Sequence, residues 1–222
     1  MKPRQAFPGD VTLTPVTEPN FPVLRQLADT IWRQHYVGII SVGQIDYMLA
    51  GRFSDEALRT HMQAADKWLE LLRVSGTPVG YCGYEVASRD RSEASPAAMK
   101  LGQLYVLETH RGMGLGRFML GHIEGRTREL GCRSLWLQVN KQNTGAVGFY
   151  RAAGFEVVRE AVFDIGGGDA PEELAGVGHG HAGAIGFHFK RPDAGVRTAA
   201  AVVTDEETTG FAFQKADAWV GG

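Results

Sequence analysis

The sequence predicts an α/β sandwich with a mixed central sheet. Strand-like and helix-like segments follow the order strand, helices, three strands, helix, strand, helix, strand, without an internal repeat. A glycine-rich loop joins a strand to a helix in the middle of this order. Apolar residues make up 44% of the 222 residues and charged residues 22%, which is the composition of a globular protein and not of a disordered or fibrous one.

The N-terminal part of the chain predicts an edge strand and three helices. The strand is expected over Val11–Val16, at an edge of the sheet because its proline has no N–H to donate. Apolar residues recur at helical spacing from residue 22 to about residue 34. Shorter helices are expected over residues 43–49 and 54–65, and Ser54 has the residue type of an N-cap.

The central part predicts a β-hairpin and the strand that leads into the glycine loop. Two apolar runs, residues 67–74 and 79–87, flank the turn signal Ser75-Gly76-Thr77-Pro78. A loop of charged and small residues separates this hairpin from a strand over residues 99–107.

The following part alternates helices and strands. A helix is expected from Gly114 to Leu130, ended by Gly131 because glycine tolerates the left-handed conformation after a helix. The remaining expected elements are a strand over residues 134–140, a helix over 143–153, a strand over 155–165 and, after a stretch rich in Gly, Ala and His, a strand over 184–190.

The glycine loop has the composition of a phosphate-binding loop. A helix N-terminus leaves backbone N–H groups without helical partners, and its dipole favours a negative charge. A Walker loop needs Lys-Ser/Thr after its last glycine, whereas Gly116 is followed by Arg117, and a dinucleotide fingerprint needs a glycine at position 117. The pattern that fits is Arg-x-x-Gly-x-Gly, formed by Arg111, Gly114 and Gly116.

A second motif lies about thirty residues further on. From Val139 to Phe155 the sequence follows the pattern Val-Asn-x-x-Asn-x-x-Ala-x-x-Phe-Tyr-x-x-x-Gly-Phe. In this order and at this distance, the two motifs resemble those of the GNAT superfamily of N-acetyltransferases. The resemblance covers residues 99–165 in its motifs. It implies a mixed, mostly antiparallel sheet with helices on both faces, and acetyl-CoA as co-substrate.

The resemblance also implies which residues hold and activate the coenzyme. The Val106 N–H would face the acetyl oxygen, and Asn143 would meet the pantetheine arm or cap its own helix. Tyr150 stands at the position of the acid that protonates the departing thiolate. The implied coenzyme-binding residues are Tyr105, Val106, Leu107, Arg111, Gly112, Met113, Gly114, Leu115, Gly116, Arg117 and Asn143.

The attacking amine needs a base and a binding site. An alkylammonium with a pKa of about 10 is charged at neutral pH, so its proton must be removed before attack. Glu108 is the first candidate for the base, and Glu85 and His110 are alternatives. In this superfamily the first helices build most of the acceptor site, and here they contribute Trp32, His35, Tyr36 and Tyr47.

The implied function is transfer of acetyl from acetyl-CoA to a primary amine of a small molecule by direct attack, without an acyl-enzyme. Two alternatives stay open. One is a non-catalytic acyl-CoA-binding regulatory module, in which the catalytic groups serve structure. The other is a protein N-terminal acetyltransferase, which would prefer peptides to small amines.

Composition argues against several other partners. The net charge of −2, with scattered basic residues, gives no reason to expect nucleic acid. No apolar run is long enough to span a bilayer and the N-terminus lacks the apolar core of a signal peptide, so we expect a cytoplasmic protein with no membrane partner. Cys82 and Cys132 form no disulfide framework. His179 and His181 are flanked by glycines that give no rigid support, so we expect no metal.

The sequence predicts one acetyltransferase-like domain over residues 10–190 and a C-terminal extension over residues 191–222. The extension matches no pattern. An ordered extension, an arm that joins a homodimer, and a disordered tail all stay open for it.

Overall fold

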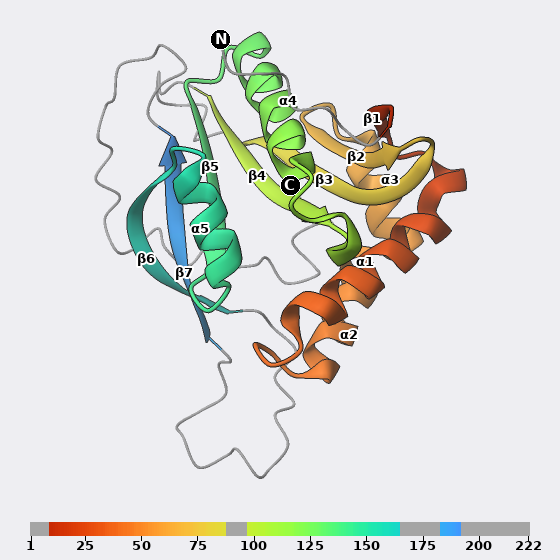
Figure 1. Ribbon diagram of the computed structural model, residues 1–222, viewed down its shortest axis with the longest axis horizontal. Coiled ribbons are helices and arrows are strands. Elements are labelled where there is room, and N and C mark those ends of the chain that lie inside the picture. Colours follow the sequence, from red (N-terminus) through yellow and green to blue (C-terminus); the bar gives the residue numbers. More distant parts are fainter. Residues whose placement is uncertain (1–8, 88–96, 165–182, 192–222) are drawn as a thin grey trace.

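The computed structural model describes residues 9–87, 97–164 and 183–191. These residues form a seven-stranded sheet in the order β1-β2-β3-β4-β5-β7-β6 (Figure 1). Neighbouring strands are antiparallel, except that β4 and β5 are parallel. The strands are β1 (Val11–Pro15), β2 (Lys67–Val74), β3 (Thr77–Ala87), β4 (Ala98–Val106), β5 (Ser134–Asn140), β6 (Glu156–Asp164) and β7 (Gly183–Arg191).

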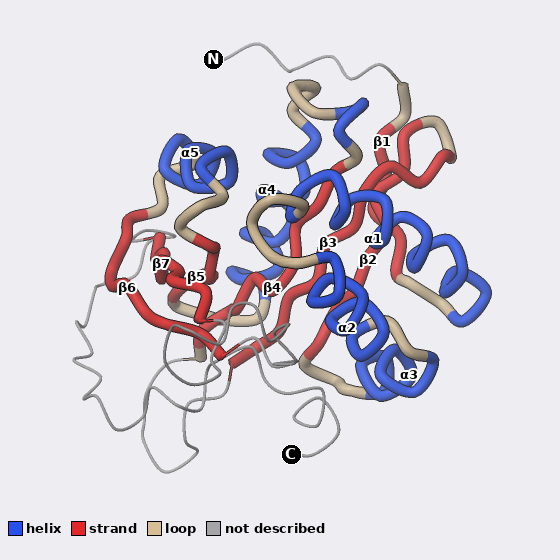
Figure 2. The backbone as a smooth tube through the Cα atoms, turned by 90° about the horizontal axis from the view of Figure 1, so that it is seen from below, coloured by secondary structure: helices blue, strands red, loops and turns tan. Residues whose placement is uncertain are grey.

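Helices cover both faces of this sheet. One apolar core lies between the sheet and the helices α4 and α5, and a second lies between the sheet and α1 and α3. Figure 2 shows α1, α2 and α3 gathered at the β1–β3 half of the sheet, with α5 beside the other half. The predicted fold class is therefore confirmed. The helical segments are α1 (Phe21–Tyr36), α2 (Val42–Arg52), α3 (Asp55–Gln63), α4 (Leu115–Glu129), α5 (Thr144–Ala152) and the short 3-10 turns η1 (Glu18–Asn20) and η2 (Glu108–His110).

Local sequence explains where several elements begin and turn. The side-chain oxygens of Ser54 and Asn143 accept hydrogen bonds from backbone N–H groups three residues on, each at 3.1 Å, and so cap α3 and α5. The β2–β3 hairpin turns at Ser75 and Gly76, whose φ angles of 48° and 81° match a two-residue turn of type I′. One difference is that α2 runs to Arg52, three residues beyond its expected end.

The strand expected near residues 184–190 is present as β7. It lies between β5 and β6 and pairs antiparallel with both. Among the described strands, the last one along the chain is therefore inserted between the two that precede it. Residues 192–222 lie outside the described residues, so the proposed boundary at residue 190 stays a prediction.

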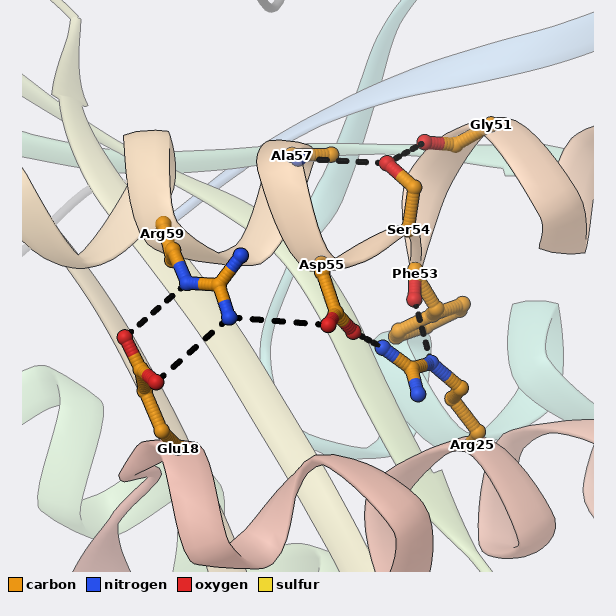
Figure 3. A network of polar contacts seen from close by, with 8 residues as sticks. All are labelled: Glu18, Arg25, Gly51, Phe53, Ser54, Asp55, Ala57 and Arg59. Carbon is orange, nitrogen blue, oxygen red and sulfur yellow. Dashed lines mark hydrogen bonds and ion pairs between the residues drawn. The ribbon is translucent and has the colours of Figure 1, made fainter.

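A polar network joins α1 to the junction of α2 and α3 (Figure 3). Nε of Arg25 donates to the Phe53 carbonyl at 2.7 Å, and the same guanidinium pairs with Asp55. Arg59 pairs with Glu18 at 3.0 Å and with Asp55 at 3.5 Å. Phe53 itself is buried in the second core. The end of α2 is thus held against α1 by both backbone and side-chain contacts.

Candidate active site

The two parallel strands at the centre of the sheet separate from each other. β4 and β5 pair only from Ala98 to Leu101 and from Ser134 to Leu137, after which no pairing continues between them. A cavity of about 130 Å³ occupies this separation, lined by residues from α1, α2, β4, β5 and α5. The cavity lies where β4 approaches the glycine loop.

A β-bulge in β4 changes the face of the sheet on which its side chains lie. Gly83 pairs with Gln103 and Tyr84 with Leu101, so Gly102 is the extra residue. Leu101 before the bulge packs in the core below α4, whereas Tyr105 after it packs against the core below α1. The bulge therefore shifts the alternation of side chains by one residue. After Gly102, the odd-numbered side chains of β4 face α1.

The backbone of Val106 points its N–H into the separation of the strands. The Leu107 N–H donates to the Val79 carbonyl of β3 at 2.8 Å. Successive residues of a strand direct their N–H groups to opposite sides. The Val106 N–H, one residue earlier, therefore points away from β3 and toward the side from which β5 has departed.

The glycine loop presents backbone N–H groups at the start of α4. Gly112 and Gly114 have φ angles of 76° and 79°, which side chains strongly disfavour. The first helical N–H bond of α4 runs from Phe118 to the Gly114 carbonyl at 3.0 Å. The N–H groups of residues 115–117 precede this bond, so the helix itself offers them no acceptor, and the positive end of the helix dipole lies at the same place.

The two arginines of the loop make different contacts. Arg111 donates from Nη2 to Nε2 of His35 on α1 at 2.8 Å, and its Nη1 lies 3.8 Å from a Glu108 carboxylate oxygen. Arg117 donates to the Ala152 carbonyl at the end of α5 at 3.0 Å. Arg111 thus connects the loop to α1, and Arg117 connects α4 to α5.

Tyr150 and Asn143 both reach the cavity from the α5 region. The Tyr150 side chain is buried, and burial raises its pKa, with a smaller contribution from Tyr36. Its phenol is therefore fully protonated at neutral pH. Asn143 caps α5 with its oxygen, in agreement with one of the two roles expected for it.

Three of the four predicted acceptor-site residues line the cavity. Trp32, His35 and Tyr36 do so, whereas Tyr47 is 45% exposed and does not. The Tyr36 and Tyr105 hydroxyls lie 3.0 Å apart. Burial lowers the pKa of His35, and the positive charge of Arg111 lowers it further, so the imidazole is neutral at neutral pH.

The candidate bases lie outside the cavity. The Glu108 side chain is 63% exposed, and Glu85 is engaged by Lys67 and Lys100 at 3.6 and 3.3 Å. His110 bonds to its neighbour Thr109 in an exposed turn. No aspartate or glutamate lines the cavity within the described part of the chain.

Sequence reasoning missed four polar residues of the cavity, namely Arg52, Gln103, Gln138 and Asn140. Arg52 ends α2, and Gln103 follows the bulge in β4. Met48 also lines the cavity, and Arg52 lies four residues after it on α2. Because residues four apart share a helix face, helical spacing would have suggested Arg52 as a cavity residue. Strand alternation would have placed Gln103 on the wrong face, because the bulge shifts the alternation by one residue.

Two further properties concern only the described residues. No helix among residues 9–87 and 97–164 is long and apolar enough to cross a bilayer. No group of three potential metal ligands occurs in those ranges or in residues 183–191. His179 and His181 lie outside the described residues.

Comparison with known proteins identifies the relatives of this chain. The profile described as "Acetyltransferase (GNAT) family" matches residues 25–155. An uncharacterized N-acetyltransferase in the pepI 3′ region of Lactobacillus delbrueckii subsp. lactis is 26% identical over 113 residues, which are 51% of this chain and 65% of that protein. The 5-NmdU N-acetyltransferase of Pseudomonas phage PaMx11 is 31% identical over 112 residues, which are 50% of this chain and 73% of that protein.

Solved structures share the fold. The PaiA N-acetyltransferase of Thermoplasma acidophilum, crystallised with coenzyme A, superimposes with a TM-score of 0.62 at 17% sequence identity. The alignment covers 83% of this chain and 99% of that one. At this identity the likeness establishes the common architecture.

Proposed function

The chain belongs to the GNAT family of acetyltransferases, and we propose that it transfers the acetyl group of acetyl-CoA to a primary amine of a small molecule. Acetyl-CoA is the co-substrate of the family. The observation that carries the proposal is the separation of β4 from β5 beside the glycine loop. Tyr150 lines the cavity in this separation, and the Val106 N–H points toward the same side of β4.

The glycine loop would hold the pyrophosphate of the coenzyme. The N–H groups of residues 112–117 supply donors, and the positive end of the α4 dipole favours the phosphates. Gly116 lies against the Phe149 ring, which a Cβ at that position would approach to 3.3 Å. A side chain there would press on α5, so glycine keeps the loop close to the helix that carries Tyr150.

The Val106 N–H would stabilise the charge that develops on the acetyl oxygen. The thioester would lie in the separation of the strands, where this N–H points. A fixed donor of this kind contributes about 3 kcal/mol in the transition state. It acts best in a site from which water is excluded.

Tyr150 would donate its proton to the coenzyme thiolate as it leaves. The ordinary pKa values of a phenol and a thiol, about 10 and about 8.5, differ by about 2 kcal/mol. Burial raises the pKa of Tyr150. The same burial raises the pKa of a thiolate formed beside it, so the proton remains transferable within the cavity.

The cavity itself would help the amine to lose its proton. An ammonium ion placed among buried aromatic rings with no carboxylate is less stable than in water, so its pKa falls. Glu108 could receive this proton only through intervening water, because its side chain lies outside the cavity. We therefore assign Glu108 to proton release toward solvent and not to direct contact with the amine.

The size of the cavity favours a small acceptor over a peptide. A volume of about 130 Å³ accommodates a compact amine next to the thioester. The test is a panel of small amines and short peptides incubated with acetyl-CoA, following release of free thiol and the mass of the acetylated product. Turnover with a small amine is expected. Turnover restricted to peptides would favour a protein N-terminal acetyltransferase, and coenzyme binding without any turnover would favour a regulatory module.

A further inference from the structure

The acceptor cavity contains a fixed positive charge. Arg52 is the one lysine or arginine among its lining residues, and no aspartate or glutamate lines it within the described part of the chain. Resting on the function proposed above, we propose that the acceptor is an amine that also carries a carboxylate, and that Arg52 binds this carboxylate. Such an acceptor belongs to the class of amino acids and other amino carboxylates.

The fold holds Arg52 in place. It is the last residue of α2, and Phe53 after it makes edge-to-face contacts with Trp32 and Tyr81, with ring centres 6.5 and 5.9 Å apart. The Phe53 carbonyl accepts the Arg25 bond described above (Figure 3). The backbone next to Arg52 is therefore anchored by ring contacts and by a hydrogen bond.

The guanidinium of Arg52 lies beside buried aromatic rings. Its central carbon is 5.6 Å from the centre of the Trp32 ring, and Trp32 is 1% exposed. A planar guanidinium can hold a carboxylate through two parallel hydrogen bonds, and such bonds strengthen where water is excluded.

Within the part of the chain that the structure describes, the charge in the cavity lining is positive. Burial raises the pKa of the hydroxyls of Tyr36, Tyr81 and Tyr105, and the positive charge of Arg52 reduces this increase. The acidic residues on adjacent elements pair with arginines outside the cavity: Asp46 with Arg33 at 2.6 Å, Asp55 with Arg25, and Glu108 with Arg111. A polyamine would therefore bring positive charge toward positive charge.

A second observation places the amine end of the acceptor. Gln103 is 6% exposed and lines the cavity, and its Oε1 accepts no hydrogen bond from the residues that the structure describes. A buried oxygen of this kind is stabilised by an N–H donor. An amino carboxylate supplies both complements, an amine N–H for Gln103 and a carboxylate for Arg52.

The experiment compares matched acceptors that differ only at the carboxylate. A set of amino acids, their carboxamides and their decarboxylated amines is assayed with saturating acetyl-CoA by thiol release. The intact protein is expected to favour the carboxylate form by about tenfold or more in kcat/KM, the effect of one charged hydrogen-bonded contact. Arg52→Gln should remove this preference, mainly through a higher KM for the amino acid, while turnover of the carboxamide changes little.

Two further variants test whether the charge of Arg52 alone is enough and whether the loss of any arginine has the same effect. Arg52→Lys keeps the positive charge but loses the planar guanidinium that can form two parallel hydrogen bonds. It should retain part of the preference for the carboxylate. Arg128→Gln removes an arginine of the α4 surface, whose Nε bonds to the Glu124 carbonyl, and should leave the preference intact. Equal use of carboxylate and carboxamide by the intact protein, or an unchanged preference in Arg52→Gln, would overturn the proposal.

The proposal can also be tested if no amine is acetylated. In that case the proposed function fails, and calorimetry with N-acetylated amino acids and their carboxamides measures the subsite directly. Tighter binding of the carboxylate form that is lost in Arg52→Gln supports the subsite. Binding that does not distinguish the two forms refutes it.

Discussion

Nη2 of Arg111 and Nε2 of His35 lie 2.8 Å apart, so the first residue of the glycine-loop motif is bonded to a side chain that lines the cavity between β4 and β5. Because arginine can only donate, the imidazole nitrogen accepts and His35 is neutral when the bond forms. The site proposed for the coenzyme and the site proposed for the amine are thus connected by one hydrogen bond.

We expect Arg111→Met to raise the pKa of His35. Burial lowers this pKa most, and the charge of Arg111 lowers it further, whereas Glu108 raises it. Removing Arg111 leaves burial in place, so the pKa should rise without reaching its ordinary value. NMR titration of the His35 ring measures the change. Arg117→Met, which removes a charge bonded to Ala152, should leave the value unchanged.

The lowered pKa of His35 in the intact protein makes stability depend on pH. The folded protein binds a proton at His35 less readily than the unfolded chain does. Its contribution to stability therefore falls as the pH drops below the ordinary histidine pKa of about 6.5. Arg111→Met should weaken this dependence in urea unfolding between pH 7 and pH 5. An unchanged His35 pKa in the variant would contradict the Arg111 contact.

We expect Tyr150→Phe to lower kcat by about 100-fold or more, the contribution of a well-placed general acid. The ring still fills its place beside Phe149 and Phe155, so coenzyme affinity and stability should change little. Thiol release and calorimetry with coenzyme A measure the two effects. Tyr47→Phe alters an exposed tyrosine outside the cavity and should leave kcat unchanged. Full turnover in Tyr150→Phe would show that another group protonates the thiolate.

Much of the fold follows from local sequence signals. Ser54 and Asn143 cap their helices as their residue types predict, and the turn at Ser75-Gly76 closes the expected hairpin. These features depend on hydrogen bonds between residues close in the chain. The order of the sheet does not, since β7 reaches its place between β5 and β6 through pairing with residues far from it in sequence.

The lining of the candidate acceptor site was harder to predict, because periodicity in the sequence does not define which faces of α2 and β4 are buried. Tyr47 and Met48 are adjacent on α2, yet Met48 lines the cavity and Tyr47 does not. Apolar and polar residues are mixed around α2, so the sequence does not define its buried face. In β4 the bulge at Gly102 reverses the alternation, and the glycine inside the strand is the local sign of it. Both differences concern which face of an element is buried, and not whether the element exists.

Alanine substitutions at Gly114 and at Gly121 should change the stability of the protein in opposite directions. Gly114 has a φ of 79°, so Gly114→Ala is expected to destabilise the protein by about 1 kcal/mol and to weaken coenzyme binding. Gly121 lies within α4 with open space around its Cβ position, so Gly121→Ala should stabilise the protein by about 0.5–1 kcal/mol. Urea unfolding measures both. Equal effects of the two changes would contradict the left-handed start of α4.

Glu70 should contribute strongly to the attachment of α4. Its carboxylate is buried, accepts from the Tyr84 hydroxyl at 3.1 Å and lies 3.0 Å from Nε2 of His122 on α4. Glu70→Ala leaves both partners without this acceptor and is expected to cost about 2–3 kcal/mol in urea unfolding. Glu56→Ala on the exposed side of α3 should cost less than about 0.5 kcal/mol. A similar loss in both variants would show that the Glu70 contacts add nothing.

The close approach of β3 to β4 gives the sharpest test of the Val106 assignment. A Cβ at Gly80 would lie 2.4 Å from the Tyr105 carbonyl oxygen, so Gly80→Ala must push the Tyr105–Val106 peptide away from β3. This peptide carries the N–H proposed to meet the acetyl oxygen. We expect lower kcat, with about 1–3 kcal/mol of lost stability. At Gly83, on the same strand, the nearest atom would be 3.4 Å away, so Gly83→Ala should change kcat little. If both variants kept full kcat while Gly80→Ala was destabilised, the position of the Val106 N–H would not matter to the reaction, and the assignment would fail.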